Sequence, residues 1–445
     1  MKLKSFSLTI FTLLAVAFIS CAQPFNKAKL DSLLDLLAEK NRAMGSLAIL
    51  KDGNIIYARA IGYKQMAPQP QIASDILTTY RIGSISKMFT ATIVFQLIEE
   101  GKLELSATLD KFYPTVANAN LITIGNMLSH RSGIHSFTDD SMYLSWSNEP
   151  KTHDEIIKLI SAYKPDFEPN AKTAYSNSNF VLLGYIIEKI CSKPYADLLQ
   201  ERICSRIGLK NTYYGGKTDV SKNESFSFMF DGSWKQQPET DMSIPHGAGS
   251  VVSTSGDLVQ FIYALFTGKL VNETSLNSMK TITDGLGMGM MKFPYDERVA
   301  YGHGGAIDGF NSILIYLPDD KLSVAYCSNG TRYSINDILI GALNIYYNKP
   351  YSMPVFTAYK VTQEELEQYV GVYSCPQIPI KVTITAKDGI LYGQGTGQPV
   401  INLEPTARHV FSFERAGIIM TFDPEKHEFL LEQGGGKFTF TKEQQ

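Results

Sequence analysis

Strand-forming segments lie at both ends of residues 24–351, and helix-forming segments lie between them. Near the start, "GSLAILKDG" and "NIIYARAIGY" flank the turn residues Asp52 and Gly53, which predicts a hairpin. Near the end, "NSILIYLPDDKLSVAYCSN" predicts another hairpin around Pro318, and "SINDILIGALNIYY" predicts a helix after it. Residues 106–268 carry the apolar stripes of helices. This order predicts an α+β fold: one antiparallel sheet, formed from both ends of the domain and flanked by helices, with a mainly helical insertion.

The character of the chain changes after residue 352. The segment "NKPYSMPVF" is typical of a linker. Beyond it, short alternating segments such as "KVTITAKDGILYGQ" and "HVFSFERAGIIMTF" predict a small all-β domain of hairpins, closing into a barrel. The predicted units are a signal peptide (1–22), the first domain (23–352), a linker (353–366) and a C-terminal β domain (367–445).

The first residues predict export. Two lysines precede an apolar stretch at 6–19 that ends in small residues, which is typical of a secretory signal and too short for a membrane span. "FISC" resembles a bacterial lipobox, which would make Cys21 a lipidated N-terminus, although Phe18 stands where Leu is commonest. The alternative is cleavage after Ala22. Either way we expect the protein in the bacterial periplasm or cell envelope, and lipidation would make it a lipoprotein anchored through Cys21.

The composition narrows the range of partners. Hydrophobic residues make up 44% of the chain, enough for a large core, and the net charge is −3 without a basic run. We therefore expect no nucleic-acid partner.

The histidines and cysteines do not form a recognisable metal site. His130 and His135 have no carboxylate between them at ligand spacing, and the later cysteines fit no zinc pattern, so we expect no metal and no cofactor. Those cysteines could form disulfides or remain free buried thiols: Cys191, Cys204, Cys327 and Cys375.

The segment "RIGSISKMFTATIVFQLIEEGKL" contains Ser84 three residues before Lys87, at the predicted start of a helix. A helix N-terminus offers free N–H groups, and a lysine one turn later lies on the same face as the serine. A serine becomes a nucleophile when a base takes its proton. The alternative is that Ser84 only caps the helix. The motif alone is weak evidence, because Ser161 and Lys164 match it within another predicted helix.

Two further motifs follow Ser84 along the chain. "YSNSNF" holds Tyr175 and Asn177, and "GHGGAIDGF" holds His303 beside a predicted strand. Each is weak alone. In this order, however, S-x-x-K, Y-x-N and H-x-G resemble the serine β-lactamase and penicillin-binding protein superfamily. The resemblance is to the branch with class C β-lactamases, D-alanyl-D-alanine carboxypeptidases, D-aminopeptidases and related esterases. "MLSHRSGI", "RIGLKNT" and "GAGSVVSTSGDL" also resemble that branch, and the resemblance spans roughly residues 26–347.

The resemblance implies a role for each matched residue. Ser84 would be the acylated nucleophile. Lys87 and Tyr175 would share the general-base work, one as neutral amine or phenolate, which requires a lowered pKa. Tyr175 would return the proton to the leaving group. Asn177 would hold Lys87 and the substrate amide by hydrogen bonds, and the backbone N–H groups of Ser84 and Ala306 would form the oxyanion hole.

His303 departs from the β-lactamase pattern. In that branch β-lactamases usually have lysine there, whereas peptidases and esterases have histidine. His303, Gly304 and Gly305 would bind substrate. If His303 must be cationic to hold a substrate carboxylate, activity on acidic substrates should fall above pH ~7. The upstream "YYGGKTDV" does not replace the motif, because Asp219 stands where a glycine is needed.

The sequence therefore predicts an exported serine hydrolase that forms an acyl-enzyme on Ser84 and acts on a D-amino-acid peptide or a small ester or amide. One alternative is a class C-like β-lactamase. The other is a penicillin-binding or ligand-binding protein without turnover. Trp146 and Trp234 belong to the core or to the substrate groove, with the core favoured. The C-terminal domain resembles the lipocalin-like barrels appended to such hydrolases.

Overall fold

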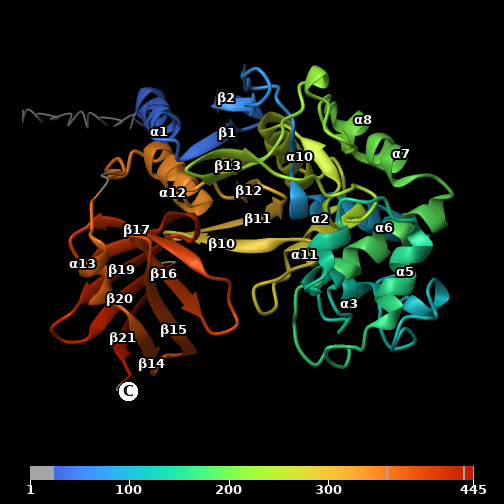
Figure 1. The fold of residues 1–445 in the computed structure, drawn as a ribbon. Coiled ribbons are helices and arrows are strands. Elements are labelled where there is room, and N and C mark those ends of the chain that lie inside the picture. Colours follow the sequence, from blue (N-terminus) through green and yellow to red (C-terminus); the bar gives the residue numbers. More distant parts are fainter. Residues whose placement is uncertain (1–24, 357–358, 434–435, 444–445) are drawn as a thin grey trace, which may run out of the picture.

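A computed structural model describes residues 25–356, 359–433 and 436–443 of the chain. The predicted signal segment, with Cys21, lies outside these ranges. Figure 1 shows a sheet with helices on both faces, a group of helices beyond one side of it, and a separate barrel beyond the other.

The main sheet joins the two ends of the first domain. Its strand order is β10-β11-β12-β13-β1-β2, with every neighbouring pair antiparallel. The strand bounds are β1 (Ala43–Lys51), β2 (Asn54–Ile61), β10 (Met291–Tyr295), β11 (Arg298–Ile307), β12 (Phe310–Leu317) and β13 (Leu322–Thr331). Both predicted hairpins are present, and β1 pairs with β13 across almost 300 residues of chain, in a register that sets Ala48 opposite Ala325. The predicted fold class is confirmed.

Helices cover the two faces of this sheet. Successive strand residues point to opposite faces, and β1 follows this rule: Ile49 packs on one side, with α1 (Lys27–Glu39) and α12 (Ile335–Tyr346). Ala48 packs on the other side, in the core that holds α2 (Ser86–Glu99) and α10 (Ser255–Phe266). That second core continues into the insertion, so α2 is buried along nearly its whole length.

The insertion is mainly helical, as predicted. Its helices are η2 (Leu109–Lys111), α3 (Ile124–Leu128), η3 (Phe137–Asp139), α4 (Tyr143–Trp146), α5 (His153–Ala162), α6 (Asn177–Cys191), α7 (Tyr195–Leu199), η4 (Gln200–Cys204), α8 (Ser205–Ile207), η5 (Val220–Lys222), α9 (His246–Gly249) and, after α10, α11 (Glu273–Lys280). Three small sheets also occur among the described residues. In one, β5 (Tyr80–Arg81), just before Ser84, pairs with β9 (Val251–Ser253), which also pairs with β6 (Tyr213–Tyr214). The other two pair β3 (Tyr63–Gln65) with β4 (Ile72–Ala73) and β7 (Phe228–Asp231) with β8 (Ser233–Gln236).

The C-terminal unit is a closed antiparallel barrel preceded by α13 (Gln363–Glu367). Its strands are β14 (Gly371–Cys375), β15 (Ile378–Lys387), β16 (Ile390–Gly395), β17 (Ile401–Ala407), β18 (Val410–Phe413), β19 (Ile418–Asp423), β20 (Glu428–Gln433) and β21 (Gly436–Lys442), with η6 (Glu414–Ala416) between β18 and β19. It has an aromatic core of its own that includes Phe411, Phe429 and Phe440. The boundaries predicted at 352 and 367 stay predictions.

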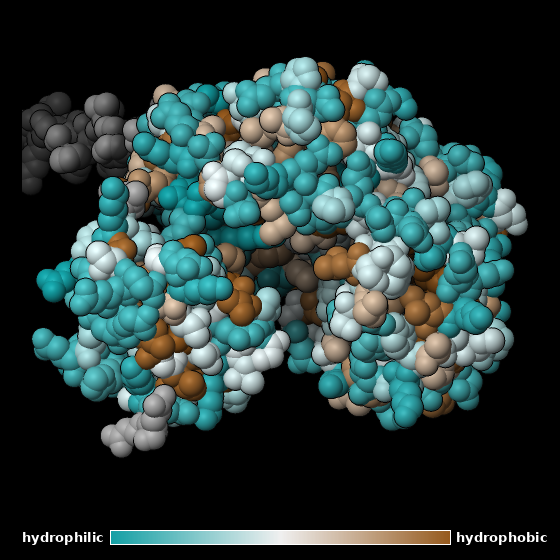
Figure 2. Space-filling view, viewed as in Figure 1, coloured by the Kyte–Doolittle hydropathy of each residue, from teal (hydrophilic) through white to brown (hydrophobic). Residues whose placement is uncertain are grey.

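Ion pairs hold the barrel against the first domain. Arg42 pairs with Glu404 at 3.1 Å and with Glu414 at 2.9 Å, and Arg332 also pairs with Glu404. Figure 2 shows a deep notch between the barrel and the helical part of the first domain. These ion pairs connect the barrel to the first domain in this structure.

The remaining sequence predictions concern tryptophans, cysteines and membrane helices. Trp234 is buried against Met44 and Phe228, and Trp146 packs against Phe137 and Tyr143, so both belong to packed clusters. The four later cysteines are free thiols. Within the described residues, no helix combines the length and apolar character needed to cross a membrane.

Candidate active site

The predicted nucleophile lies in a tight turn between β5 and α2. Residues Gly83–Ile85 form the 3-10 turn η1, and Ser84 is its middle residue. No side chain caps η1 or α2 by a hydrogen bond, so Ser84 does not act as a helix cap. Ser84 is partly exposed, above an otherwise buried helix. The interpretation of Ser84 as a structural cap is therefore wrong.

Lys87 is completely buried beneath Ser84. Its Nζ lies 3.1 Å from Oγ of Ser84, 2.7 Å from Oδ1 of Asn177 and 2.9 Å from the carbonyl oxygen of Ala248. Burial lowers the pKa of Lys87 well below its ordinary value. A neutral amine has two N–H groups, which Asn177 and Ala248 accept. Its lone pair then remains for the proton of Ser84, which is the geometry of a general base.

Tyr175 completes the cluster around the serine hydroxyl. Its hydroxyl interacts with the side chain of Ser84, and its ring centre lies 4.8 Å from Nζ of Lys87. His130 stacks on the ring of Tyr175 with centres 4.4 Å apart, so this histidine packs beneath the site. Burial raises the pKa of Tyr175, which keeps the phenol protonated. Of the two predicted bases, these pKa shifts favour the Lys87 amine over the phenolate, and the role of each residue stays a prediction.

Asn177 is held in one orientation. Its backbone N–H donates to Oγ of Ser136, and its side-chain Nδ2 donates to Oγ1 of Thr138 at 2.8 Å. These bonds fix the amide so that Oδ1 faces Lys87. The structure therefore gives Asn177 its predicted contact with the lysine.

Strand β11 lies against the nucleophile turn. Gly83 has a φ of +51°, and a Cβ at this position would lie 2.8 Å from the backbone nitrogen of Ala306. Gly305 has no room for a Cβ because the carbonyl oxygen of Ile82 fills that space, while Gly304 is more open. Residues 303–307 extend past the end of β10, which pairs only as far as Gly302. Ser84 and Ala306 thus lie where the predicted oxyanion hole needs them, and that role stays a prediction.

His303 is buried in the same strand, 2% exposed. Its Nδ1 lies 2.5 Å from the carbonyl oxygen of Gly304, so Nδ1 carries the proton and Nε2 keeps a lone pair. Burial lowers the pKa of His303 to about 3. This histidine is neutral at physiological pH. The hypothesis that a cationic His303 holds a substrate carboxylate stays untested, and the lowered pKa of His303 in the free protein weighs against it.

Sequence reasoning missed the residues that position the site. Ala248 acts through a backbone carbonyl, which has no residue signature, although "GAGSVVSTSGDL" was part of the family resemblance. Arg81 and Asp308, which flank the two catalytic segments, form a buried pair. The signal for Asp308 was its place in "GHGGAIDGF"; only the fold reveals its partner.

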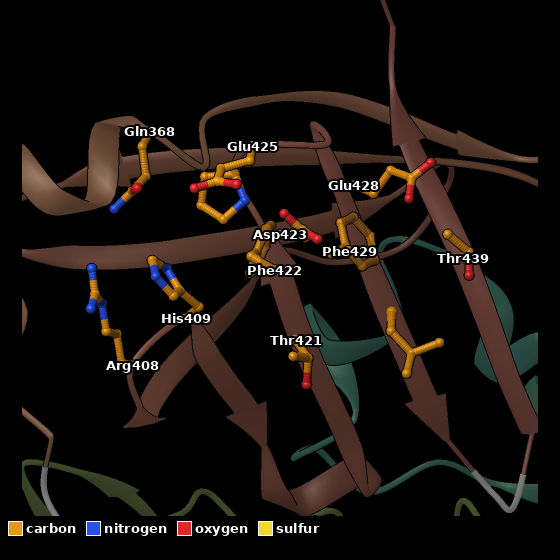
Figure 3. Close-up of a pocket in the computed structure, with 12 residues that line it drawn as sticks. Gln368, Arg408, His409, Thr421, Phe422, Asp423, Glu425, Glu428, Phe429 and Thr439 are labelled. Carbon is orange, nitrogen blue, oxygen red and sulfur yellow. The ribbon is translucent and has the colours of Figure 1, made fainter.

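A second hollow lies on the barrel, away from this cluster. It encloses about 660 Å³ and is lined by residues of β19 to β21 together with Gln368, Arg408 and His409 (Figure 3). None of the predicted catalytic residues lines it. Three carboxylates and one arginine line this hollow: Asp423, Glu425, Glu428 and Arg408. Its lining residues do not include a serine or a cysteine that could act as a nucleophile.

Comparison with known proteins gives one family match and several proteins of similar sequence or fold. The family described as Beta-lactamase matches residues 30–338. Penicillin-binding protein 4* of Bacillus subtilis (strain 168) is 26% identical over 92% of this chain and 97% of its own length. The structure of D-amino acid amidase from Ochrobactrum anthropi SV3 is 25% identical, with a TM-score of 0.64 over 72% of this chain and 99% of that one. The octameric penicillin-binding protein homologue from Pyrococcus abyssi shares the fold over 93% of this chain and all of its own (TM-score 0.65, 23% identity).

Proposed function

The chain belongs to the beta-lactamase family of serine hydrolases, and from this premise we propose that it is an exported enzyme that forms an acyl-enzyme on Ser84. Its substrates would be D-amino-acid peptides or small amides and esters. The observation that carries the proposal is the buried Lys87, whose Nζ lies 3.1 Å from Oγ of Ser84 and donates to two fixed acceptors.

The proposed reaction has two halves. In the first, Nζ of Lys87 takes the proton of Ser84 while Oγ bonds to the substrate carbonyl carbon, and the oxyanion accepts from the N–H groups of Ser84 and Ala306. Tyr175 gives its proton to the leaving nitrogen or oxygen as that bond breaks, and the Lys87 ammonium reprotonates it. In the second half, water loses a proton to Nζ of Lys87 and attacks the acyl carbon. The bond to Oγ of Ser84 then breaks, the Lys87 ammonium returns its proton to Oγ, and the acid leaves.

The neutral ring of His303 favours a substrate that is uncharged or carries an amino group. The lone pair on its Nε2 would accept from a substrate N–H and would repel a carboxylate. The similarity to a D-amino acid amidase at 25% identity points the same way. We therefore favour amidase, aminopeptidase or esterase activity over carboxypeptidase activity.

A β-lactamase is the second candidate, supported by the match to the Beta-lactamase family. A neutral histidine in place of the usual lysine weighs against it, because penicillins carry a carboxylate. A binding protein without turnover is the third. The complete set of Ser84, Lys87 and Tyr175 in hydrogen-bonding contact weighs against that interpretation.

A fluorophosphonate probe tests the nucleophile. We expect wild-type protein to be labelled once, Ser84→Ala to be unlabelled, and Ser161→Ala to be labelled like wild type. Ser161 begins the other S-x-x-K match, but its hydroxyl bonds to Thr115 on the surface. Folded wild-type protein that takes no label would support a binding protein instead.

A substrate panel then separates the enzyme classes. We expect turnover of D-amino-acid amides to exceed that of L-amino-acid amides, of acetylated D-alanyl-D-alanine and of a chromogenic cephalosporin. Preferred hydrolysis of the cephalosporin would support the β-lactamase candidate.

The proposed export is tested by the mass of the N-terminal peptide of protein purified from cells. A peptide that begins with a diacylated Cys21 indicates a lipoprotein. A peptide that begins with unmodified Gln23 indicates cleavage after Ala22.

A further inference from the structure

Two histidines and a glutamate, residue types that ligate metals, form a cluster outside the catalytic machinery. His153 is the first residue of α5, Glu188 lies in α6, and His246 is the first residue of α9. One donor atom from each lies within 4.8 Å of the other two. The three residues are 35 and 58 positions apart in the chain, so the fold brings them together.

The separations in this cluster suit shared metal ligands better than hydrogen bonds. Nδ1 of His153 lies 3.5 Å from Oε2 of Glu188, and Nε2 of His246 lies 3.5 Å from Oε1 of the same carboxylate. Normal hydrogen bonds between such atoms are shorter. Ligands bonded to one tetrahedral zinc ion at about 2.0–2.1 Å lie about 3.3 Å apart. The two 3.5 Å approaches use different oxygens of Glu188, and one donor atom from each residue lies within 4.8 Å of the other two, so the three side chains must move closer together to share one ion.

The ligands are already held in place. The ring of His153 stacks on Tyr185 with centres 3.9 Å apart, and the ring of His246 packs against the same tyrosine at 4.6 Å. The backbone N–H of Tyr195 donates to Oε1 of Glu188 at 2.6 Å. Supporting contacts of this kind orient the ligands in metal proteins and raise their affinity for the ion.

His246 is the least satisfied member of the cluster. Its side chain is 3% exposed, and its Nδ1 has no hydrogen-bond partner among the described residues. Its Nε2 has only the long approach to Glu188. Buried polar groups are normally hydrogen-bonded, so an imidazole that is buried and poorly bonded is a notable exception. A metal bond at Nε2 would replace this long approach with a close polar contact, although Nδ1, which lies against Gly184, would keep no partner within the described part of the chain.

We propose that His153, Glu188 and His246 bind a zinc ion or a similar divalent transition metal. Two imidazoles and one carboxylate are a ligand set that zinc accepts. The side chain of His153 is 48% exposed, which gives the ion an entry route and leaves a fourth position for water. This site departs from our expectation, drawn from His130 and His135, that the chain holds no metal.

The metal site connects to the catalytic lysine through α9. This short helix carries His246 and, two residues later, the carbonyl of Ala248 that accepts from Lys87 at 2.9 Å. The carbonyl of Gly247, between them, accepts from Thr90 of α2 at 2.6 Å. A metal bound at His246 would therefore fix the segment that orients Lys87. This is a positioning effect, because the ion would not touch the substrate.

Cobalt titration of the full-length protein tests the site without any substrate, so its result is separate from that of the proposed hydrolase. We expect one Co²⁺ per chain, with the intense visible absorption of a tetrahedral site that Zn²⁺ abolishes. His153→Ala should remove the absorption. His135→Ala should retain it, because His135 is another partly exposed histidine beside a carboxylate, 2.9 Å from Asp166, outside the cluster.

Glu188→Gln tests the site in a variant that we expect to fold normally. The glutamine amide oxygen can still accept a hydrogen bond from the backbone N–H of Tyr195, but the negative charge of the ligand is lost. We expect this variant to keep its circular dichroism spectrum and to lose at least tenfold in Co²⁺ affinity. Zn²⁺ should also raise the thermal midpoint of wild type but not of His153→Ala. No cobalt absorption in wild type, or the same absorption in His153→Ala, would overturn the proposal.

Discussion

Arg81 and Asp308 form an ion pair that is 4% exposed on both sides, with Nη1 of the arginine 3.0 Å from Oδ2 of the aspartate. Arg81 lies three residues before the nucleophile, and Asp308 lies two residues after Ala306. The pair therefore ties the nucleophile turn to the strand that faces it. Arg81 also reaches Glu239 at 2.5 Å, and Asp308 accepts from the backbone and hydroxyl of Thr240.

Breaking this pair should destabilise the fold and slow acylation. Arg81→Met would leave the buried Asp308 with its hydrogen bonds from Thr240 but without a cationic partner, and breaking a buried ion pair typically costs about 3–5 kcal/mol of unfolding free energy. Denaturant unfolding gives this cost, and the rate of fluorophosphonate labelling gives the effect on the site. Lys193→Met, which removes an exposed pair with Glu201, should cost under about 1 kcal/mol. Equal costs would show that the buried pair has no special role.

Replacement of Lys87 should remove the general base. Lys87→Arg keeps the positive charge but cannot deprotonate, so we expect kcat/KM to fall by about 10²–10⁴-fold. Lys164→Arg, in the other S-x-x-K match, should leave the rate unchanged. A variant Lys87→Arg that retains normal labelling would contradict the assignment of Lys87 as the base.

The pH profile should reflect the buried amine. Because burial lowers the pKa of Lys87 well below its ordinary value, the neutral base forms at a lower pH than in a free lysine and is lost when acidification protonates it. Activity should therefore rise with pH through that lowered pKa and reach a plateau, because the raised pKa of Tyr175 keeps its proton in place as well. A rise in kcat/KM that occurs only near the ordinary lysine pKa, about 10.4, would contradict the buried neutral amine.

His303 should not titrate in the working range. Its pKa is lowered to about 3, so it stays neutral above pH ~5, and kcat/KM for acidic and neutral substrates should follow parallel profiles between about pH 5 and 8. His303→Lys should improve activity on carboxylate-bearing substrates relative to neutral amides, measured as the ratio of the two kcat/KM values. If the wild-type ratio of kcat/KM for acidic substrates to kcat/KM for neutral substrates falls as pH rises through about 6.5, a protonated His303 must bind the substrate carboxylate.

The sequence was informative where local pattern decides the structure. Both hairpins follow from strand-forming runs around turn residues, and Ser84 faces Lys87 because residues three apart share a helix face. It could not reveal charge states that depend on tertiary burial. His303 has an ordinary pKa near 6.5 in a free chain, and only the packing around β11 lowers it. Nor could it pair Arg81 with Asp308, 227 residues away.

Gly83→Ala should reduce activity, because the added Cβ would disturb the close contact between the nucleophile turn and Ala306 at the predicted oxyanion hole. The new Cβ would lie 2.8 Å from the backbone nitrogen of Ala306, so β11 must move away from the nucleophile turn. Loss of one oxyanion donor typically costs about 10²–10³-fold in rate, and we expect a loss of this size in labelling and hydrolysis.

Gly101→Ala is the matched control for that substitution. Gly101 lies just after α2, has a similar φ of +68°, and would place a Cβ in open space, with no neighbouring heavy atom within 4 Å. Both variants should therefore lose the roughly 1–2 kcal/mol that a left-handed residue other than glycine costs, measured by denaturant unfolding. Only Gly83→Ala should lose activity. Equal activity in the two variants would mean that the approach of Ala306 to the nucleophile turn is not needed for catalysis.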